Sequence, residues 1–311
     1  MPEAIAGIDT IKQMKEQEPA VKAQEQHNVS SGKPAGSVHM AIQGYEGSFH
    51  QEAANNFFKN RVTVECCDTF KEVIAAARDA DRTDGCLMAI ENSIAGSILP
   101  NYNLLQGSDL RIAGEVYMQI NQNLLVNPEV ELDDIREVHS HTMALQQCYE
   151  YLDQFRWKLV EAEDTALSAR HIAQHKAKHI AAIASKLAAE LYGLKIIAPK
   201  IQTLKNNYTR FLVLRRREDL QETVEGDKAS INFHTDHSKG SLAKVLSIIA
   251  KEDVNLTKLQ SFPIPGTQFR YQFHADMEFE QLKDFEKVMD KIKPVTTGLK
   301  VYGIYKRGSW K

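Results

Sequence analysis

Short apolar runs that alternate with segments of helical periodicity constrain the fold of this chain most strongly. From Val38 onward, the runs "VHMAI", "EVHS" and "HIAAI" are followed by "SFHQEAANNFF", "TMALQQCYEYL" and "ASKLAAELYG", which place apolar residues at helical spacing. Strands that alternate with helices in this way are typical of α/β folds, in which helices cover the faces of a mostly parallel sheet. The sequence therefore predicts an α/β fold over this part of the chain.

A charged segment, "LRRREDLQETVEGDK", separates this region from a second unit with a different order of elements. The patterns after it predict strand, helix, strand, strand, helix and strand, beginning at "ASINFHT" and ending at "GLKVYGIYKR". This βαββαβ order is the ferredoxin-like arrangement. The segment "PIPGTQ" between the two middle strands contains two prolines and one glycine, as expected of a hairpin turn.

The length predicts a protein of two domains, and the charge balance argues against two classes of partner. A chain of 311 residues exceeds what one hydrophobic core usually holds. We expect a flexible N-terminal extension at 1–38, a first domain at 39–215, a linker at 216–228 and a second domain at 229–311. The 38 basic and 41 acidic residues give a formal net charge of −3, so neither nucleic acid nor a membrane surface is an expected partner.

The N-terminus and the cysteines favour a cytoplasmic location. The segment "MPEAIAGIDTIKQMKEQEPAVKAQEQ" lacks the basic start, apolar block and cleavage site of a secretory signal, and no apolar run reaches the roughly 20 residues of a membrane span. The four cysteines contain no C-x-x-C pair, and the adjacent Cys66 and Cys67 are poorly placed to bridge each other. We expect reduced, mainly structural thiols.

Four junctions between a predicted strand and the following helix carry polar residues. They are "QGYEGSFHQEA", "CLMAIENSIAGS", "VHSHTMALQQC" and "EAEDTALSA". Open parallel sheets bind ligands at the carboxyl ends of their strands, where helix N-termini present unpaired N–H groups. Helix capping alone explains each junction, since Ser, Thr, Asn and Asp are favoured at helix starts. Together with Arg210, the four junctions predict a cleft for a small anion such as a carboxylate.

Other motifs give no support for a bound metal or nucleotide. His171 and His175 lie four residues apart, but no acidic third ligand stands at a typical spacing, so we expect a solvated helix face. The "GYEG" segment lacks the Gly-Lys-Ser/Thr ending of a P-loop. The sequence also lacks G-x-S-x-G, H-E-x-x-H and a full G-x-G-x-x-G motif.

The four junctions, together with "NNYTRFLVL", resemble the prephenate dehydratase family, whose members convert prephenate to phenylpyruvate in phenylalanine biosynthesis and carry a C-terminal ACT regulatory domain. The likeness extends from about residue 39 to 311 and includes "IENSIAGSILPNYNLL" and "AAIASKLAAELYGL". It implies that the first domain consists of two α/β lobes, like the periplasmic-binding-protein fold, with the active site in the cleft between them. The second domain would be a ferredoxin-like ACT domain.

The resemblance also implies the residues of the site. Catalytic roles carry over to Thr209, Glu91, Asn92 and Gln147, with Thr209 as the principal catalytic residue. Substrate binding carries over to Ser93, Ser140, Glu163, Thr165 and Arg210, and effector binding to Gly240, Ser241, Leu242, Asn255 and Leu256. No metal or redox cofactor is implied, because losing carbon dioxide and a hydroxyl makes the ring of prephenate aromatic and thereby drives the reaction.

The chain departs from the family pattern at several positions. Asn121 and Gln122 stand where members often carry histidine, and Thr142 replaces a common proline. In the predicted ACT domain, "LQSFP" stands where Glu-Ser-Arg-Pro is usual, so Gln260 and Phe262 remove both charges of that motif. The resemblance implies feedback inhibition by phenylalanine, whose strength these two positions would change. ACT domains commonly pair through their sheets, which implies a homodimer or homotetramer.

The relative orientation of Thr209 and Arg210 decides the expected mechanism. Alternation along an extended strand would place the two side chains on opposite faces. We expect instead a twist or kink near Tyr208 or Thr209, so that both side chains reach one ligand while Phe211 packs into the core. Arg210 would then pair with the side-chain carboxylate of prephenate, because a bidentate pair fixes direction as well as charge.

Thr209 would donate a hydrogen bond to the departing hydroxyl of prephenate. A threonine hydroxyl is a weak acid, so we expect a relay with Glu91 or Glu163 as the ultimate source of the proton. Three other functions stay open from the sequence. They are arogenate dehydratase, a carboxylate- or amino-acid-binding protein without catalytic activity, and a catalytically inactive ACT sensor.

Overall fold

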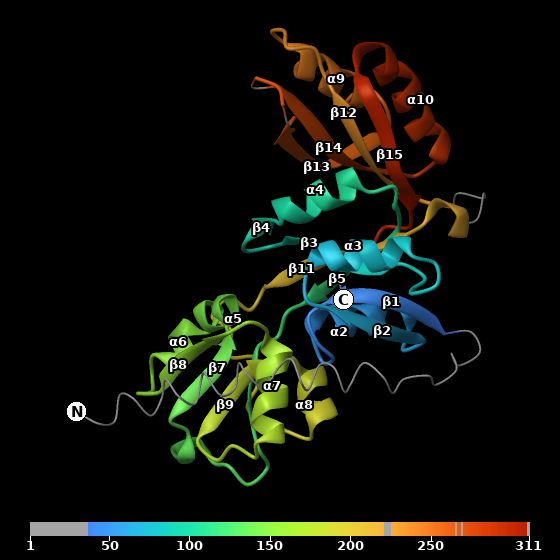
Figure 1. Cartoon of the computed structure of the whole chain (residues 1–311). Coiled ribbons are helices and arrows are strands. Elements are labelled where there is room, and N and C mark those ends of the chain that lie inside the picture. Colours follow the sequence, from blue (N-terminus) through green and yellow to red (C-terminus); the bar gives the residue numbers. More distant parts are fainter. Residues whose placement is uncertain (1–36, 221–224, 265, 269, 310–311) are drawn as a thin grey trace. The chain divides into compact units, whose positions relative to one another are not determined.

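The computed structural model describes residues 37–220, 225–264, 266–268 and 270–309 (Figure 1). Except for its last two residues, the expected N-terminal extension at 1–38 lies outside the described residues. Residues 38–311 form one compact unit. Within its described part the strands form three separate sheets.

The first sheet is built mainly from the beginning of the chain. Its strands are β1 (Val38–Gln43), β2 (Val62–Cys67), β3 (Cys86–Asn92), β4 (Gly96–Ser97), β5 (Arg111–Gln119) and β11 (Tyr208–Arg215), in the order β2-β1-β3-β11-β5 with β4 beside β3. Its helices are α2 (Phe49–Phe58), α3 (Phe70–Arg78) and α4 (Leu99–Gly107). Side chains of α2 pack on one face of the sheet, and those of α3 and α4 pack on the other.

The second sheet belongs to the middle of the chain. Its strands are β10 (Lys195–Ala198), β6 (Asn123–Val126), β9 (Ile180–Ala184), β7 (Glu137–His141) and β8 (Lys158–Ala162), in that order across the sheet. Its helices are α5 (Thr142–Gln147), α6 (Tyr149–Leu152), α7 (Thr165–Gln174) and α8 (Lys186–Tyr192). The first two helices share one core cluster with this sheet, while α7 and α8 share another. The two lobes predicted for the first domain are therefore confirmed.

The prediction of mostly parallel sheets was wrong, because both lobes contain mixed sheets. In the first lobe β1 pairs in parallel with β2 and β3, but β11 pairs antiparallel with both β3 and β5. Strand β11 follows the whole second lobe in sequence and runs back into the first. The chain therefore enters β11 at the edge of the first sheet where β3 ends.

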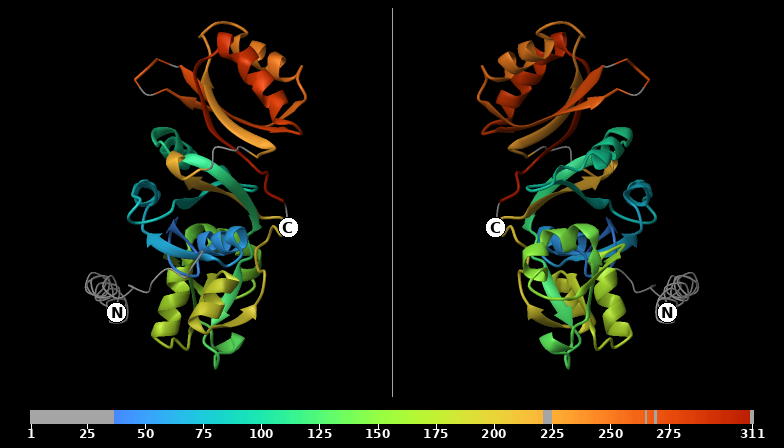
Figure 2. Two further views of the ribbon diagram at one scale, coloured as in Figure 1. Left: turned by 90° about the vertical axis from the view of Figure 1, so that its right-hand side faces the viewer. Right: turned by 90° about the vertical axis from the view of Figure 1, so that its left-hand side faces the viewer.

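The third sheet has the predicted βαββαβ order. Its strands are β12 (Lys228–His234), β13 (Val254–Pro263), β14 (Tyr271–Phe279) and β15 (Thr297–Tyr305), and its helices are α9 (Ser241–Ile249) and α10 (Leu282–Ile292). Across the sheet the order is β13-β14-β12-β15. Figure 2 shows both helices on the same face of this sheet, where they enclose one apolar core. Three short 3-10 helices are η1 (Leu132–Asp134), η2 (Arg217–Asp219) and η3 (Lys293–Val295).

The helix-free face of the third sheet packs against α4 of the first lobe. Phe262, Tyr302 and Tyr305 of this sheet share a core cluster with Tyr102 and Leu105 of α4. The rings of Phe262 and Tyr102 lie 5.4 Å apart between centroids, and Phe262 is only 2% exposed. The aromatic residue that departs from the family motif is thus a core residue that joins the third sheet to the first lobe.

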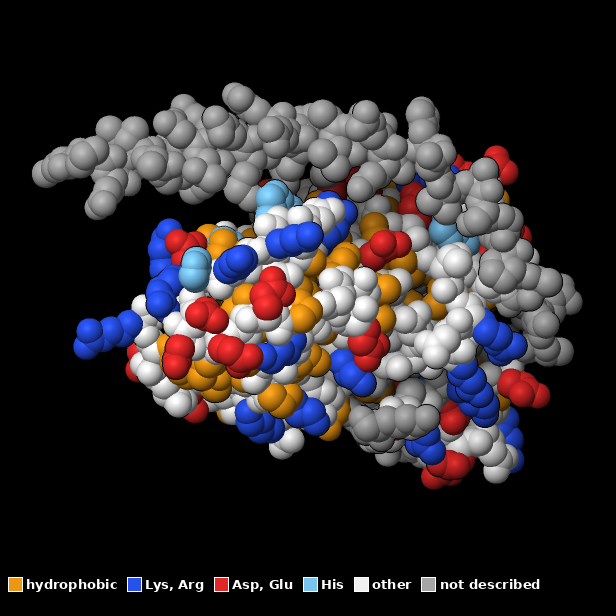
Figure 3. Space-filling model, turned by 90° about the horizontal axis from the view of Figure 1, so that it is seen from below, with side chains coloured by type: hydrophobic (Ala, Val, Ile, Leu, Met, Phe, Trp, Pro, Cys, Tyr) orange, Lys and Arg blue, Asp and Glu red, His pale blue; other side chains and the backbone are white. Residues whose placement is uncertain are grey.

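The mixed charge of the surface and the free cysteine thiols agree with what the composition predicted. On the face shown in Figure 3, Lys and Arg side chains are interspersed with Asp and Glu side chains. All four cysteines are free thiols, as predicted, and burial raises the pKa of Cys148 to about 12. In the part of the chain that the structure describes, no helix combines the length and the apolar composition required to cross a membrane.

His50 gives the stability of the first lobe a defined pH dependence. Its ring packs edge-on against Phe211, with 5.1 Å between centroids, and burial lowers its pKa from 6.5 to about 4. The unfolded chain therefore binds more protons than the folded chain between those two values, so stability falls as the pH drops from about 6.5 to about 4. We expect the unfolding temperature, measured by calorimetry, to drop less between pH 6.5 and pH 4 in His50→Gln than in the parent protein. Substitution of the exposed His237 by Gln should leave it unchanged, and equal curves for the two variants would contradict the assignment.

Candidate active site

The two lobes meet through the loops at the carboxyl ends of their strands. Ser185, the N-cap residue of α8, donates from its hydroxyl to the carbonyl of Gly47 at 2.5 Å, and the Tyr192 hydroxyl donates to the carbonyl of Glu46 at 2.6 Å. The approach is so close that a Cβ atom on Gly47 would lie 2.8 Å from the Cα of Ala188. Gly47 also has a φ of +85°, so a side chain there would strain the backbone as well. We call the whole region in which the two lobes contact each other, including the hydrogen bonds from Asn92 through Asn207 to Gln147, the interlobe junction.

Asn92, at the end of β3, orients the hydroxyl of Thr209 at the interlobe junction. The side-chain oxygen of Asn92 accepts hydrogen bonds from the backbone N–H groups of Ile94 and Ala95, each at 2.9 Å. These two donors fix the orientation of the amide, so its nitrogen points the other way. That nitrogen donates to Thr209 Oγ1 at 3.0 Å and to Asn207 Oδ1 at 2.7 Å.

The same chain of amides continues into the second lobe. Asn207 uses its oxygen to accept from Asn92, so its nitrogen is the donor to Gln147 Oε1 at 3.0 Å. Gln122 donates to the same oxygen at 3.3 Å. Among the hydrogen bonds of the described residues, neither Gln147 Nε2 nor the proton of the Thr209 hydroxyl has a partner in the protein. Two donors are thus oriented and available at the interlobe junction.

The remaining polar residues predicted at the first-domain junctions lie in three different environments. Ser93 accepts from the N–H of Tyr208 at 2.9 Å and donates to the carbonyl of Asn206 at 3.1 Å, so it fixes the chain just before Thr209. Ser140 is fully buried and donates to the carbonyl of Ile183 at 2.7 Å, which gives it a structural contact rather than a surface for substrate. Thr165 is the first residue of α7 and Glu163 is exposed, and their predicted contacts with substrate stay predictions.

The predicted kink that would bring Thr209 and Arg210 to one ligand was wrong. Thr209 lies directly across from Asn92 in the pairing of β11 with β3, and Arg210 lies directly across from Glu91. The register shifts only after this, between Arg210 and Phe211. Ordinary alternation therefore places Thr209 and Asn92 on one face of the sheet and Arg210 and Glu91 on the other.

The side-chain contacts of Arg210 and Glu91 overturn their predicted roles. Arg210 is 4% exposed and donates to Glu115 Oε2 at 2.8 Å and to Asp276 Oδ2 at 2.5 Å. Glu91 forms an ion pair with Lys258 of β13, and its Oε2 lies 4.0 Å from Nη1 of Arg210. Arg210 is therefore not free to hold a substrate carboxylate, and Glu91 is not placed to supply a proton to Thr209. Phe211 packs into the core of the first lobe, as predicted.

Asn207 is the residue of this site that the sequence analysis missed. It is fully buried and connects Asn92 in the first lobe to Gln147 in the second. Its position two residues before Thr209 was the available indication, since residues i and i+2 of an extended chain share a face. Gln122, noted in the sequence only as a departure, also contacts Gln147, and its own Oε1 is buried without a partner among the described residues.

The five residues predicted to bind an effector are spread around the start of α9 and the edge strand β13. Gly240 is the N-cap residue of α9 with a φ of +84°, and Ser241 donates to the Thr235 hydroxyl at 3.2 Å. Ser241 and Leu242 line a pocket of about 320 Å³. Leu242 and Leu256 pack against the same core cluster, and Asn255 is exposed on β13.

Fold and site together define a class of protein. Two α/β lobes present oriented amide and hydroxyl donors where they meet, and a ferredoxin-like domain packs on the first lobe. The family model described as "Prephenate dehydratase" matches residues 40–219. The chain belongs to the prephenate dehydratase family.

Three relatives and solved structures to which the chain is similar carry different names. A protein of Arabidopsis thaliana named "Arogenate dehydratase/prephenate dehydratase 2, chloroplastic" is 34% identical over 290 residues, covering 89% of this chain and 74% of that protein. A solved prephenate dehydratase of Arthrobacter aurescens in complex with L-Phe is 26% identical with a TM-score of 0.77, over 87% of this chain and 90% of that one. A solved quorum-quenching acylase named GqqA is 29% identical with a TM-score of 0.78, over 86% and 97%.

Proposed function

We propose that this chain catalyses the decarboxylative dehydration of prephenate to phenylpyruvate at the interlobe junction. The hydrogen bond from Asn92 Nδ2 to Thr209 Oγ1 at 3.0 Å carries the proposal. Because the Thr209 oxygen accepts this bond, its proton is directed away from Asn92. The hydroxyl is thus ready to donate to an oxygen of the substrate.

The chemistry requires a donor at the leaving oxygen of prephenate. The bond between the ring carbon and its carboxylate breaks, carbon dioxide leaves, and the electron pair moves into the ring as the bond to the hydroxyl on the opposite ring carbon breaks. A proton delivered to that hydroxyl turns it into water, and the ring becomes aromatic. Thr209 supplies the hydrogen bond that stabilises the charge developing on the oxygen. With Glu91 on the other face of the sheet, Glu163 stays the candidate source of the proton.

The two carboxylates of prephenate should be bound by different kinds of protein group. A ring carboxylate held tightly in the ground state would be harder to lose as carbon dioxide, so neutral donors suit it better than a cation. For the side-chain carboxylate, which stays on the product, Gln147 Nε2 is an available neutral donor, whereas the N–H of Leu167 in the first turn of α7 is already bound by the side chain of Asp164. We assign the side-chain carboxylate to Gln147 in place of Arg210, whose guanidinium is bound to Glu115 and Asp276.

One experiment tests the function and separates its alternatives. Purified protein is incubated with prephenate or with arogenate, and the products are identified by mass spectrometry. We expect phenylpyruvate from prephenate. Phenylalanine formed from arogenate, with prephenate left unchanged, would establish arogenate dehydratase instead. The absence of a product from either substrate would favour the binding protein or the inactive sensor.

We also propose that residues 39–215 form the catalytic domain and that residues 229–311, joined through 216–228, form an ACT regulatory domain that binds phenylalanine. The solved relative in complex with L-Phe supports this effector. Strand β13 lies at the edge of the third sheet, so its free side is suited to pairing with a second copy in a homodimer or homotetramer. Phenylalanine titrated into the prephenate assay should lower the rate. The cytoplasmic location stays a prediction.

A further inference from the structure

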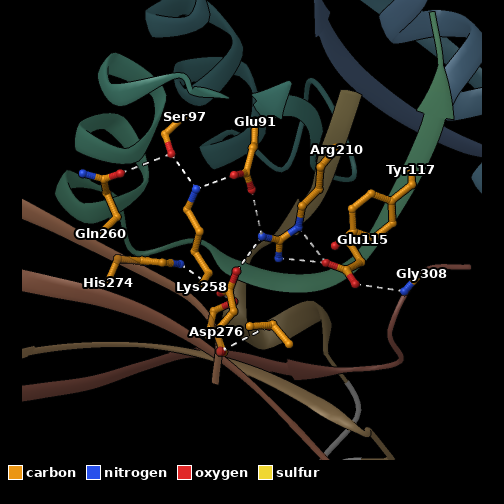
Figure 4. Close-up of polar contacts among 12 residues, drawn as sticks. Glu91, Ser97, Glu115, Tyr117, Arg210, Lys258, Gln260, His274, Asp276 and Gly308 are labelled. Carbon is orange, nitrogen blue, oxygen red and sulfur yellow. Dashed lines mark hydrogen bonds and ion pairs between the residues drawn. The ribbon is translucent and has the colours of Figure 1, made fainter. Parts of the chain in front are cut away.

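Two ion pairs connect the C-terminal domain to the strands that carry Asn92 and Thr209. Lys258 of β13 pairs with Glu91 of β3, and Asp276 of β14 pairs with Arg210 of β11 (Figure 4). Glu91 directly precedes Asn92 in the sequence, and Arg210 directly follows Thr209. Each strand therefore carries a site residue on one face and, at the adjacent position, a residue bound to the C-terminal domain on the other.

The contact between Asp276 and Arg210 is buried and fully hydrogen bonded. Asp276 is 0% exposed, and its second oxygen accepts from the Ser230 hydroxyl at 2.6 Å and from His274 at 2.9 Å. Burial alone would raise the pKa of Asp276, but the charge of Arg210 and the bonds from His274 and Ser230 hold it well below the usual value. Asp276 therefore stays ionised and paired. The guanidinium of Arg210 also donates to the Tyr305 hydroxyl at 3.1 Å, so its position is fixed from several sides.

The contact between Lys258 and Glu91 is partly buried and involves a third residue. The side chain of Lys258 is 16% exposed and that of Glu91 is 30% exposed. The ammonium of Lys258 also donates to the Ser97 hydroxyl at 2.6 Å, and Ser97 donates to the neutral amide of Gln260 at 3.2 Å. Lys258 thus holds the end of β3 at Glu91 and the short strand β4 at Ser97, as Figure 4 shows.

From this geometry we infer that Lys258 and Asp276 of the C-terminal domain are positioning residues for the reaction. They act through Glu91 and Arg210 on the adjacent Asn92 and Thr209. A strand moves as a unit over two neighbouring residues, because its backbone hydrogen bonds tie both faces together. Loss of a pair on one face changes how firmly the site residues on the other face are held. This inference rests on the proposed function for its kinetic test and on the structure alone for its exchange test.

The kinetic test uses Lys258→Met, which removes the charge and keeps most of the side chain. We expect kcat for prephenate to fall about 3- to 30-fold with a smaller change in KM, the size typical of coupling through residues outside a site. Lys258→Arg should restore most of the activity because it keeps a cation. Lys287→Met is the matched control, since it breaks an ion pair with Asp284 within α10 and should leave kcat unchanged.

The variant Glu91→Gln provides a second kinetic test, which does not depend on whether Lys258→Met folds. It keeps the size of the side chain and should lower kcat to a similar extent. The double variant Glu91→Gln/Lys258→Met should be no slower than the slower single variant, because both changes remove the same interaction. Additive losses, or a kcat of Lys258→Met equal to that of Lys287→Met, would overturn the inference.

Hydrogen exchange gives a readout that needs no substrate. Amides of the peptide that contains β3 and β4, the strands that Lys258 holds at Glu91 and Ser97, should exchange faster in Lys258→Met than in Lys287→Met, when each is compared with the parent protein. Equal exchange in the two variants would overturn the inference even if both lose activity. If the parent protein does not turn over prephenate, the proposed function fails, and the exchange comparison still decides whether the C-terminal domain holds these strands.

Discussion

Thr209→Val is expected to lower kcat for prephenate by about 10²- to 10⁴-fold, the range that a positioned proton donor commonly contributes. Valine keeps the shape of threonine but cannot donate to the leaving oxygen. KM should change much less, since the hydroxyl acts mainly as the bond to that oxygen breaks. Steady-state rates of phenylpyruvate formation measure both constants.

The control for this substitution is Thr209→Ser, which keeps the hydroxyl and the acceptor for Asn92. It should retain much more activity than Thr209→Val. Thr209 is 8% exposed, so the unfolding temperature of each variant has to be measured alongside its rate. Near-normal turnover by folded Thr209→Val would remove Thr209 from the mechanism.

Asn207→Asp is expected to lower kcat by about 10²-fold or more, comparable with the loss of one oriented donor at a catalytic site. The carboxylate oxygen that replaces the amide nitrogen cannot donate to Gln147, so the chain of oriented amides from Asn92 to the second lobe is broken. It also places a negative charge at a buried position next to a dianionic substrate, so KM should rise as well.

The matched control is Asn206→Asp, which makes the same chemical change one residue earlier. The side chain of Asn206 is exposed, so the charge there is solvated and should alter kcat little. If Asn207→Asp and Asn206→Asp are equally active, the chain of amides has no part in orienting the catalytic donors.

The sequence predicted the fold well because its patterns are local. Strand and helix periodicity is set by which residues each element buries, so the βαββαβ order of the last domain could be read directly. The direction of β11 could not, because it depends on the chain passing through the whole second lobe before it returns beside β3. Strand pairing between distant segments is not encoded in the periodicity of either one.

The sequence predicted some site residues correctly and others wrongly, and strand geometry is again the reason. The motifs identified Asn92, Gln147 and Thr209, which the structure brings into one hydrogen-bonded chain. They also suggested Glu91 and Arg210, because a motif does not record which face of a strand each residue occupies. Plain alternation separated Thr209 from Arg210 correctly, and the added assumption of a kink was the mistake. The acidic partners of Arg210, at positions 115 and 276, are distant in sequence and gave no local sign of their role.

A structure of the protein with bound phenylpyruvate tests the central claim most directly. We predict that phenylpyruvate lies at the interlobe junction. Thr209 Oγ1 and Gln147 Nε2 should each lie within hydrogen-bond distance of phenylpyruvate or of a water molecule at the position of the departed hydroxyl. A ligand bound instead in the cavity of about 780 Å³ that Arg210, Lys258 and Asp276 line on the opposite face would contradict the account.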